Sequence, residues 1–490
     1  MTEHMASFPV LTCMLLAPVV GLTILLFLKE EQGFLVRMVS LVSAGISFAL
    51  SIYTFVGYDK ALGGLQFVEK YQWVKAFGIT YYVGVEGMNA PLLLLTGIVI
   101  FTGVLTMWEL QERVREYFIF QLALVTGVFG VFMSYDMFFF FLFYEIAVVP
   151  MYILILIWGS TRKIYAAMKL TLYLMAGSGL IIPGILMLYS SSGLFTFDMV
   201  QLHGVAFAPW IQKTAFVLMF LGFGVLAGVW PFHTWSPVGH VAAPTAVSML
   251  HAGVLMKLGA FAILRVAMYL CPQGFQYWAQ FMGLLAAVGI VYGVFVGLAQ
   301  TDLKYVIGYS SVSHMGIVGL GLATGTVDGL NGAVFQMFAH GVMTALFFSA
   351  VGYIYDRTHT RDILELGGFS KIMPVASAFF ITAALCGAGV PGMASFWAEL
   401  LVLVSAVKVF PIRGLFAIAS LVIGALFALR VVQNTFFNDP NPKFTHFEDV
   451  SPFLGLPRMI LIGFMIFFGL FPQTMVGLIK TSIVPFIQGM

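Results

Sequence analysis

Four charged side chains lie inside long apolar stretches of this chain. Two are glutamates, Glu145 within Phe-Tyr-Glu-Ile-Ala and Glu399 within Phe-Trp-Ala-Glu-Leu, and two are lysines, Lys169 and Lys257. A charge at the centre of a lipid bilayer costs at least about 2.5 kcal/mol on insertion scales, so such residues usually serve an ion or proton path. A carboxylate that approaches or leaves a buried lysine changes the lysine's affinity for its proton. We therefore interpret the four residues as candidate proton carriers.

Histidines recur in or beside the same apolar stretches. They are His233, His240, His251, His314 and His340. Imidazole accepts and donates protons near neutral pH through two nitrogens, which suits a relay. A single buried histidine is usually a hydrogen-bonded core residue, but five of them, accompanied by Ser310, Ser311, Ser313 and Gln336, favour a polar axis. None falls at the i, i+4 spacing of a helical metal site, so we expect no metal.

Three of the charged residues also have plain structural interpretations. Lys169 lies about one helical turn beyond the basic pair Arg162 and Lys163 and can extend its ammonium to the membrane surface. Glu145 can be satisfied by one structural hydrogen bond, and Glu399 by solvent near the interface. Lys257 is too central for its ammonium to reach water easily.

The composition requires a membrane. Of 490 residues, 61% are hydrophobic and 9% are charged, and the mean hydropathy is +1.00. Such a chain lacks the polar surface of a soluble protein, so lipid is its expected surrounding. Backbone groups in lipid must bond within a segment, which predicts helices. The formal charge of +2 gives no reason to expect a nucleic-acid partner.

The apolar runs predict about 14 membrane-spanning helices in a single all-α membrane domain over residues 1–490. The expected spans are 8–28, 34–57, 81–107, 117–134, 136–158, 165–190, 210–232, 241–270, 274–300, 304–324, 329–354, 372–405, 412–434 and 456–480. The first run lacks a basic leader and a small-residue cleavage site, so a retained helix is expected in preference to a signal peptide.

Helix breakers interrupt the seventh and twelfth expected spans. The first interruption is Gly228-Val229-Trp230-Pro231, and the second runs from Gly387 to Gly392 around Pro391. Broken helices at membrane depth are tolerated where protein or water satisfies the freed backbone groups. Their five-span separation predicts two five-helix repeats of inverted orientation, at 117–270 and 274–434, between N-terminal helices (1–110) and a C-terminal loop and helix (435–490). Two packing kinks are the alternative.

Basic residues collect in the odd-numbered connections, which predicts that these are cytoplasmic and that both chain ends are external. Cys13, Cys271 and Cys386 are scattered through apolar surroundings without a Cys-x-x-Cys spacing. We expect no iron–sulfur or zinc site on this chain.

Five motifs stand out, at 143–150, 230–245, 304–316, 336–341 and 355–362. Together they resemble subunit M of bacterial NADH-quinone oxidoreductase (respiratory complex I), and the resemblance extends over nearly the whole chain. The central motifs are shared by all antiporter-like subunits. The Arg-Thr-His-Thr-Arg-Asp loop that ends at Asp362, followed by the Gly-Val-Pro-Gly break and by Glu399, looks specific to the M type, since the sister subunits tend to carry Lys at the latter position.

The resemblance implies roles for individual residues. Glu145 would be the fifth-helix member of a Glu/Lys pair, Lys257 the central eighth-helix lysine, His314 and His340 the relay, and Glu399 the terminal group. It also implies proton translocation in a bacterial inner membrane beside adjacent antiporter-like subunits of the membrane arm. FMN, iron–sulfur clusters and quinone would belong to partner subunits, because this chain carries no nucleotide loop, flavin motif or cysteine cluster.

One family feature is missing. The pattern places a lysine in the seventh helix where this chain has Leu226, and Ser236 to His240 and His251 also depart from it. Lys169, His233 or His251 would then replace that lysine, the route would differ, or the chain would be a non-pumping scaffold. The nearest rival function is a subunit of a multisubunit Na⁺/H⁺ antiporter or membrane-bound hydrogenase, and a solitary solute carrier is the most distant. The electron donor, the quinone and the choice between H⁺ and Na⁺ are not specified by the sequence.

Overall fold

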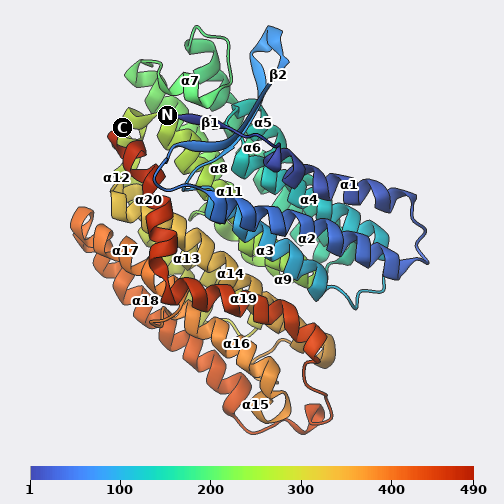
Figure 1. Cartoon of the computed structure of the whole chain (residues 1–490). Coiled ribbons are helices and arrows are strands. Elements are labelled where there is room, and N and C mark those ends of the chain that lie inside the picture. Colours follow the sequence, from blue (N-terminus) through green and yellow to red (C-terminus); the bar gives the residue numbers. More distant parts are fainter. Residues whose placement is uncertain (1, 490) are drawn as a thin grey trace.

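The computed structural model describes residues 2–489, and within them the chain is predominantly helical (Figure 1). Twelve helices in this part of the chain are long and apolar enough to cross a membrane, which makes this a multi-pass membrane protein. The helices of the N-terminal half are α1 (Val10–Phe27), α2 (Gly33–Gly57), α3 (Ala90–Thr106), α4 (Val114–Met133), α5 (Met137–Trp158), α6 (Lys163–Ser191), α7 (Met199–His203), α8 (Pro209–Ala227), α9 (Trp235–Ala242), α10 (Thr245–Leu250) and α11 (Met256–Ala262).

The second half continues the same pattern. Its helices are α12 (Pro272–Leu298), α13 (Leu303–Thr324), α14 (Val327–Thr358), α15 (Phe369–Ile372), α16 (Pro374–Gly387), α17 (Ala394–Val409), α18 (Pro411–Val432), α19 (Pro452–Leu470) and α20 (Pro472–Gln488). Short polar caps explain where several helices begin. Asp136 and Asp302 accept hydrogen bonds from the first backbone N–H groups of α5 and α13, which satisfies donors that a helix start leaves free.

The all-α membrane fold is confirmed in its main part, but the expected span 81–107 is wrong in its first part, where the chain forms a strand. A three-stranded sheet of β1 (Glu3–Met5), β2 (Leu65–Val74) and β3 (Ile79–Val85) precedes α3, with strand order β1-β2-β3. β1 pairs in parallel with β2, and β2 pairs antiparallel with β3 with Lys70 opposite Tyr82. Figure 1 shows the sheet at the end of the molecule where both chain ends lie.

One further expected span is divided. The segment predicted as 456–480 is two helices, because α19 ends at Leu470 and α20 begins at Pro472. Proline fits the first turn of a helix but cannot continue the preceding one. Against the fourteen spans expected, the described residues thus contain twelve that satisfy length and hydropathy, with α3 and α16 apolar but shorter.

The helix breakers coincide with interruptions in the structure. Between α8 and α9 the chain forms the 3-10 turn η2 (Phe232–Thr234), and Gly228 has a φ of +70°. Between α16 and α17, Gly389 and Gly392 have φ of +67° and +93°. Glycine adopts this left-handed region without the steric cost that a Cβ imposes.

Two helical stretches form the centre of the molecule. The segment 245–268 and helix α14 are fully buried over their most apolar windows, whereas only 28–39% of the residues in the corresponding windows of α1, α2 and α18 are buried. The 245–268 stretch includes two π-helical turns, η3 (His251–Leu255) and η4 (Ile263–Met268). Such turns are rare and occur frequently at functional sites.

Candidate functional site

Lys257 lies at the centre of this buried stretch, one residue into α11. Its side chain is fully buried. The Nζ donates a hydrogen bond to the carbonyl oxygen of Ala252 in the π-helical turn η3 and lies 2.6 Å from His340 Nδ1 on α14. No carboxylate within residues 2–489 forms an ion pair with this lysine, so its polar partners are a carbonyl dipole and an imidazole.

A row of polar side chains continues from His340 into α13 and α17. The rings of His340 and His314 have centroids 5.2 Å apart. His314 Nδ1 lies 3.1 Å from Glu399 Oε1, and Gln336 Nε2 donates to Glu399 Oε1 at 3.0 Å and approaches His314 Nδ1 at 3.2 Å. Lys257, His340, Gln336, His314 and Glu399 thus form a buried row, which we call the central axis.

The second helix interruption lies against the end of the central axis. A Cβ on Gly389 would come within 2.8 Å of Glu399 Oε2, in addition to the strain of a positive φ. Only glycine therefore lets the backbone between α16 and α17 approach the carboxylate so closely. Glu399 is 2% exposed, so the structure does not support the interpretation of a solvated interfacial carboxylate.

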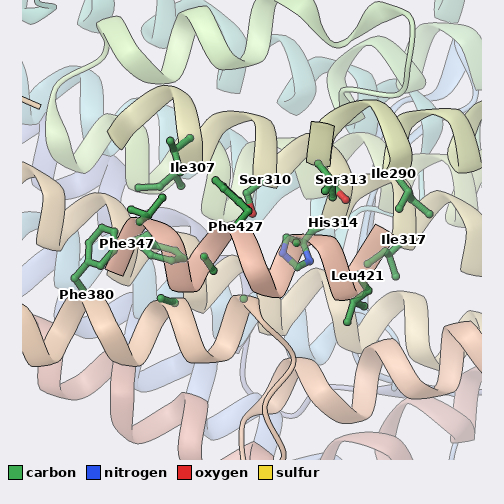
Figure 2. A pocket seen from close by; sticks show the side chains of 17 residues that line it. Ile290, Ile307, Ser310, Ser313, His314, Ile317, Phe347, Phe380, Leu421 and Phe427 are labelled. Carbon is green, nitrogen blue, oxygen red and sulfur yellow. The ribbon is translucent and has the colours of Figure 1, made fainter. Parts of the chain in front are cut away.

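A cavity of about 40 Å³ opens beside His314. At roughly 10–15 Å³ per water it has room for about three or four water molecules. Figure 2 shows Ser310, Ser313 and His314 of α13 at this cavity, with Phe347, Phe380 and Phe427 among the apolar residues around it. The serine hydroxyls give water polar partners in an otherwise apolar cavity.

His240 and His251 form a second group, which precedes Lys257 in the sequence and lies outside the central axis. Their rings are 4.1 Å apart, His240 Nε2 lies 3.0 Å from Ser236 Oγ, and His251 stacks on Trp235 with centroids 4.9 Å apart. Both histidines are fully buried, and within the described residues neither nitrogen of His251 has a hydrogen-bond partner.

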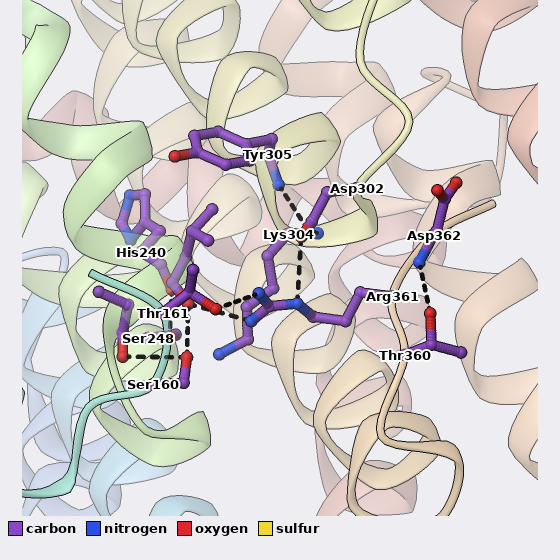
Figure 3. Close-up of polar contacts among 12 residues, drawn as sticks. Ser160, Thr161, His240, Ser248, Asp302, Lys304, Tyr305, Thr360, Arg361 and Asp362 are labelled. Carbon is purple, nitrogen blue, oxygen red and sulfur yellow. Dashed lines mark hydrogen bonds and ion pairs between the residues drawn. The ribbon is translucent and has the colours of Figure 1, made fainter. Parts of the chain in front are cut away.

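The backbone that follows His240 is held by a cluster of polar and charged side chains (Figure 3). Arg361 pairs with Asp302 at 3.2 Å and donates to the carbonyl oxygen of Val241 at 3.1 Å. Lys304 Nζ donates to the carbonyl oxygen of Ala243 at 2.8 Å, and the Ser248 hydroxyl donates to that of His240 at 2.9 Å. The cluster satisfies carbonyl groups that the end of α9 leaves without helical partners.

Glu145 stands apart from the central axis. It is half-buried and accepts a hydrogen bond from the Ser178 hydroxyl of α6 at 2.5 Å. Within residues 2–489 no ion pair joins it to Lys169, one of the three residues named above as replacements for the missing lysine. Lys169 is half-buried, with its Nζ near the rings of Tyr165 and Tyr173.

Leu226 and His233 supply no ion-pair partner for Glu145 within residues 2–489. Leu226 on α8 is fully buried and cannot titrate. His233 is buried and packs on Tyr292 with centroids 4.8 Å apart, and within the described residues its ring nitrogens have no hydrogen-bond partner. Neither fills the position of the missing lysine by a contact to Glu145.

Sequence reasoning overlooked a second buried ion pair. Arg265 NH1 in the π-helical turn η4 lies 3.0 Å from Glu86 Oε1, with both side chains at most 2% exposed. The observation that identified Glu145, a charged residue within an expected membrane span, applies to both residues of this pair. Glu86 falls in the expected span 81–107 and Arg265 in the expected span 241–270.

The fold and the central axis define a multi-pass membrane protein with a buried row of ionisable side chains between its helices. The family model described as NADH:quinone oxidoreductase/Mrp antiporter, TM matches residues 134–427. NADH-quinone oxidoreductase subunit M of Rickettsia conorii is 33% identical over 98% of this chain and 99% of its own length. The subunit M of Rhodobacter capsulatus is 34% identical over 92% of this chain and 90% of its own.

Solved structures of membrane complexes contain chains with the same fold. A chain of respiratory complex I from Thermus thermophilus with bound NADH has a TM-score of 0.90 and 26% identity, covering 98% of this chain and 99% of that one. A chain of the Mrp complex from Dietzia shares the fold, with a TM-score of 0.82 and 20% identity over 98% of this chain and 97% of that one. This chain belongs to the NADH-quinone oxidoreductase subunit M family of antiporter-like membrane proteins.

Proposed function

We propose that the chain is a proton-translocating, antiporter-like subunit of a complex I-type NADH-quinone oxidoreductase. The observation that carries the proposal is the central axis, in which the buried side chains of Lys257, His340, His314 and Glu399 follow one another across four helices, α11, α14, α13 and α17. Burying ionisable groups in such number is costly, and in membrane proteins they mark proton and ion routes. Redox chemistry then takes place on partner subunits that hold FMN, iron–sulfur clusters and quinone, and its energy reaches this chain through charge rearrangement.

The axis moves a proton in three steps. Glu399 Oε1 first gives a proton to His314 Nδ1, which lies 3.1 Å away, while Gln336 keeps its amide on the carboxylate in either state. The cavity beside His314 supplies water to this first step. The 5.2 Å between the two imidazole centroids is bridged by water or by rotation of a ring. A proton on His340 Nδ1 then passes to the Nζ of a neutral Lys257, which lies 2.6 Å away.

The remaining features of the proposal concern the wider molecule. The interruptions at 228–234 and 388–393 would be the broken helices of two inverted repeats, 117–270 and 274–434. Glu145 would link the chain electrically to the neighbouring antiporter-like subunit, and Lys169, His233 or His251 would replace the absent lysine. The protein would lie in the bacterial inner membrane with both ends external, in contact with adjacent membrane-arm subunits and lipid.

Replacing Glu399 with glutamine in the intact complex tests the proposal. Glutamine preserves size and hydrogen bonding but cannot ionise, so the ratio of protons pumped to electrons transferred should fall while subunit content and quinone reduction persist. Asp328, an acidic residue in the first turn of α14, provides a control as Asp328→Asn. An unchanged ratio in an assembled Glu399→Gln complex would refute the proposal.

A non-pumping scaffold is the second candidate, favoured by Leu226 and by the absence of a cation at Glu145 within the described ion pairs. It predicts that Glu145→Gln and Glu399→Gln both leave the ratio unchanged. A subunit of an Na⁺/H⁺ antiporter or membrane-bound hydrogenase would instead pump or exchange without quinone-reducing partners, which copurification of the intact complex decides.

A further inference from the structure

The ion pair of Glu86 and Arg265 is the most completely buried ion pair within residues 2–489, and the central axis does not use it. Arg265 belongs to the same helical stretch as Lys257 and follows it by eight residues, about 12 Å along a helix. Its guanidinium lies over Tyr135, 4.0 Å from the ring centroid, and 4.7 Å from that of Tyr269. The pair therefore stands between the middle of the molecule and the end that carries the sheet.

Glu86 is held in place by the backbone. Its N–H donates to Asn89 Oδ1 at 2.7 Å, and Asn89 in turn donates to the carbonyl oxygens of Gly84 and Phe132 at 3.1 and 2.9 Å. The backbone of Glu86 is thus held just before α3, and from there its carboxylate reaches Arg265 of η4.

The pair is close but incompletely hydrogen-bonded. Although Glu86 Oε1 and Arg265 NH1 are 3.0 Å apart, neither atom makes an aligned hydrogen bond within residues 2–489, and the same holds for the other guanidinium nitrogens and for the Tyr135 hydroxyl. Buried polar groups without protein partners are normally satisfied by ordered water. Water bound among these groups would form a route along which a proton can move.

Side chains lead from this pair to the surface. Tyr135 packs on Tyr82 with ring centroids 5.6 Å apart, and the Tyr82 hydroxyl donates to Glu3 Oε1 at 2.7 Å. Lys70 lies over the Tyr82 ring at 4.1 Å and pairs with Asp198 at 2.8 Å. The Lys70 side chain is 30% exposed, so the polar groups reach solvent at the sheet end of the molecule.

From this arrangement we propose that Glu86 is a proton-exit group and Arg265 its fixed counter-charge, a function that rests on the proton translocation proposed above. A proton that leaves Lys257 crosses bound water to the Glu86 carboxylate, which becomes neutral while Arg265 stays protonated. Glu86 then releases the proton to water beside Tyr135 and Tyr82, and its ion pair with Arg265 is restored. Arg265, 3.0 Å from the carboxylate, stays in place as its counter-charge whenever the proton has left.

The test uses the intact complex, with Glu86→Gln beside Glu399→Gln. If Glu86 is the exit, Glu86→Gln lowers the ratio of protons to electrons as far as Glu399→Gln does, with normal assembly. Glu69→Gln is a matched control, because Glu69 is also buried at the sheet end but accepts hydrogen bonds from the start of α1 and serves structure. It should leave the ratio unchanged.

The outcomes separate the two proposals. If Glu399→Gln lowers the ratio and Glu86→Gln does not, the exit is refuted and the translocation proposal stands; if neither lowers it, both fail. Should Glu86→Gln not assemble, Glu86→Asp keeps the charge pair and allows a second measurement, the infrared carboxyl band that appears during turnover. A band that shifts between wild type and Glu86→Asp supports proton uptake at this residue, and the absence of any shift overturns it.

Discussion

The glutamates Glu145 and Glu399, one in each half of the membrane domain, have different surroundings. Glu399 lies at 2% exposure in a row with Gln336, His314, His340 and Lys257. Glu145 is half-buried and bonds to a single serine hydroxyl, with the buried, uncharged Leu226 in the position where the family pattern has a lysine. The contrast leads to a prediction: a buried charge joins a proton route only where neighbouring helices supply further titratable groups.

The largest effect is expected at Lys257. Methionine in its place keeps the length of the side chain but removes the only ammonium that contacts His340 in the structure's described residues. Loss of a positioned acid–base group typically slows proton transfer by about 10²-fold or more, so pumping through this chain should cease. Proton uptake by vesicles that hold the intact complex measures this loss of pumping. Lys257→Arg, which keeps a charge but cannot deprotonate, should block pumping in the same way. Normal pumping in Lys257→Met would show that the axis is not the route.

A smaller effect is expected for Gln336→Leu. The amide contributes a hydrogen bond to Glu399 at 3.0 Å, and bonds to charged groups contribute about 1.5–3 kcal/mol. We expect proton uptake at least about tenfold slower, since 1.4 kcal/mol corresponds to tenfold in rate. Gln336→Glu, which retains an acceptor but adds a second carboxyl beside Glu399, should also be slow. If Gln336→Leu pumps at the normal rate, the amide is only a packing element.

Much of this arrangement was predictable from the sequence, and the reason lies in the cost of charge in lipid. Helix bounds such as 137–158 and 303–324 agree with the expected spans to within a few residues, because length and hydropathy fix them. The same argument singled out Lys257, His314, His340 and Glu399, which the structure brings together in one buried row. Their functional roles remain predictions, as does the division into repeats.

Other features depended on tertiary contacts that single-residue patterns do not carry. The sheet was missed because Tyr81 to Val85 read as the apolar start of a span, whereas pairing with β2 holds this segment as a strand. The Glu86–Arg265 pair joins residues far apart in sequence. Likewise, a mid-membrane cation was expected at Glu145, but the rotation of α5 turns this residue toward Ser178 and a partly exposed face.

Leu226→Lys would sharpen the comparison by giving the first half the lysine of the family pattern. Because the central axis does not include Leu226, the ratio of protons to electrons should not change. Burying a cation without a partner costs several kcal/mol, so the variant complex should unfold at a lower temperature. Leu226→Met, similar in volume and uncharged, is the control for packing. A rise in the ratio would instead show that the first half lacks only this one charge.

The smallest effect is expected for Ser178→Ala, which removes the hydrogen bond to Glu145. A half-buried carboxylate that loses one donor can turn toward water or lipid headgroups, so the cost should be about 1 kcal/mol in unfolding free energy and the ratio of protons to electrons should stay the same. Thermal unfolding and proton uptake of the same preparation measure both quantities. Ser377→Ala, whose hydroxyl donates only to the Met373 carbonyl oxygen of its own helix, is the matched control. A clear fall in pumping for Ser178→Ala alone would mean that the position of Glu145 matters for the route, and that the two halves differ less than their contacts suggest.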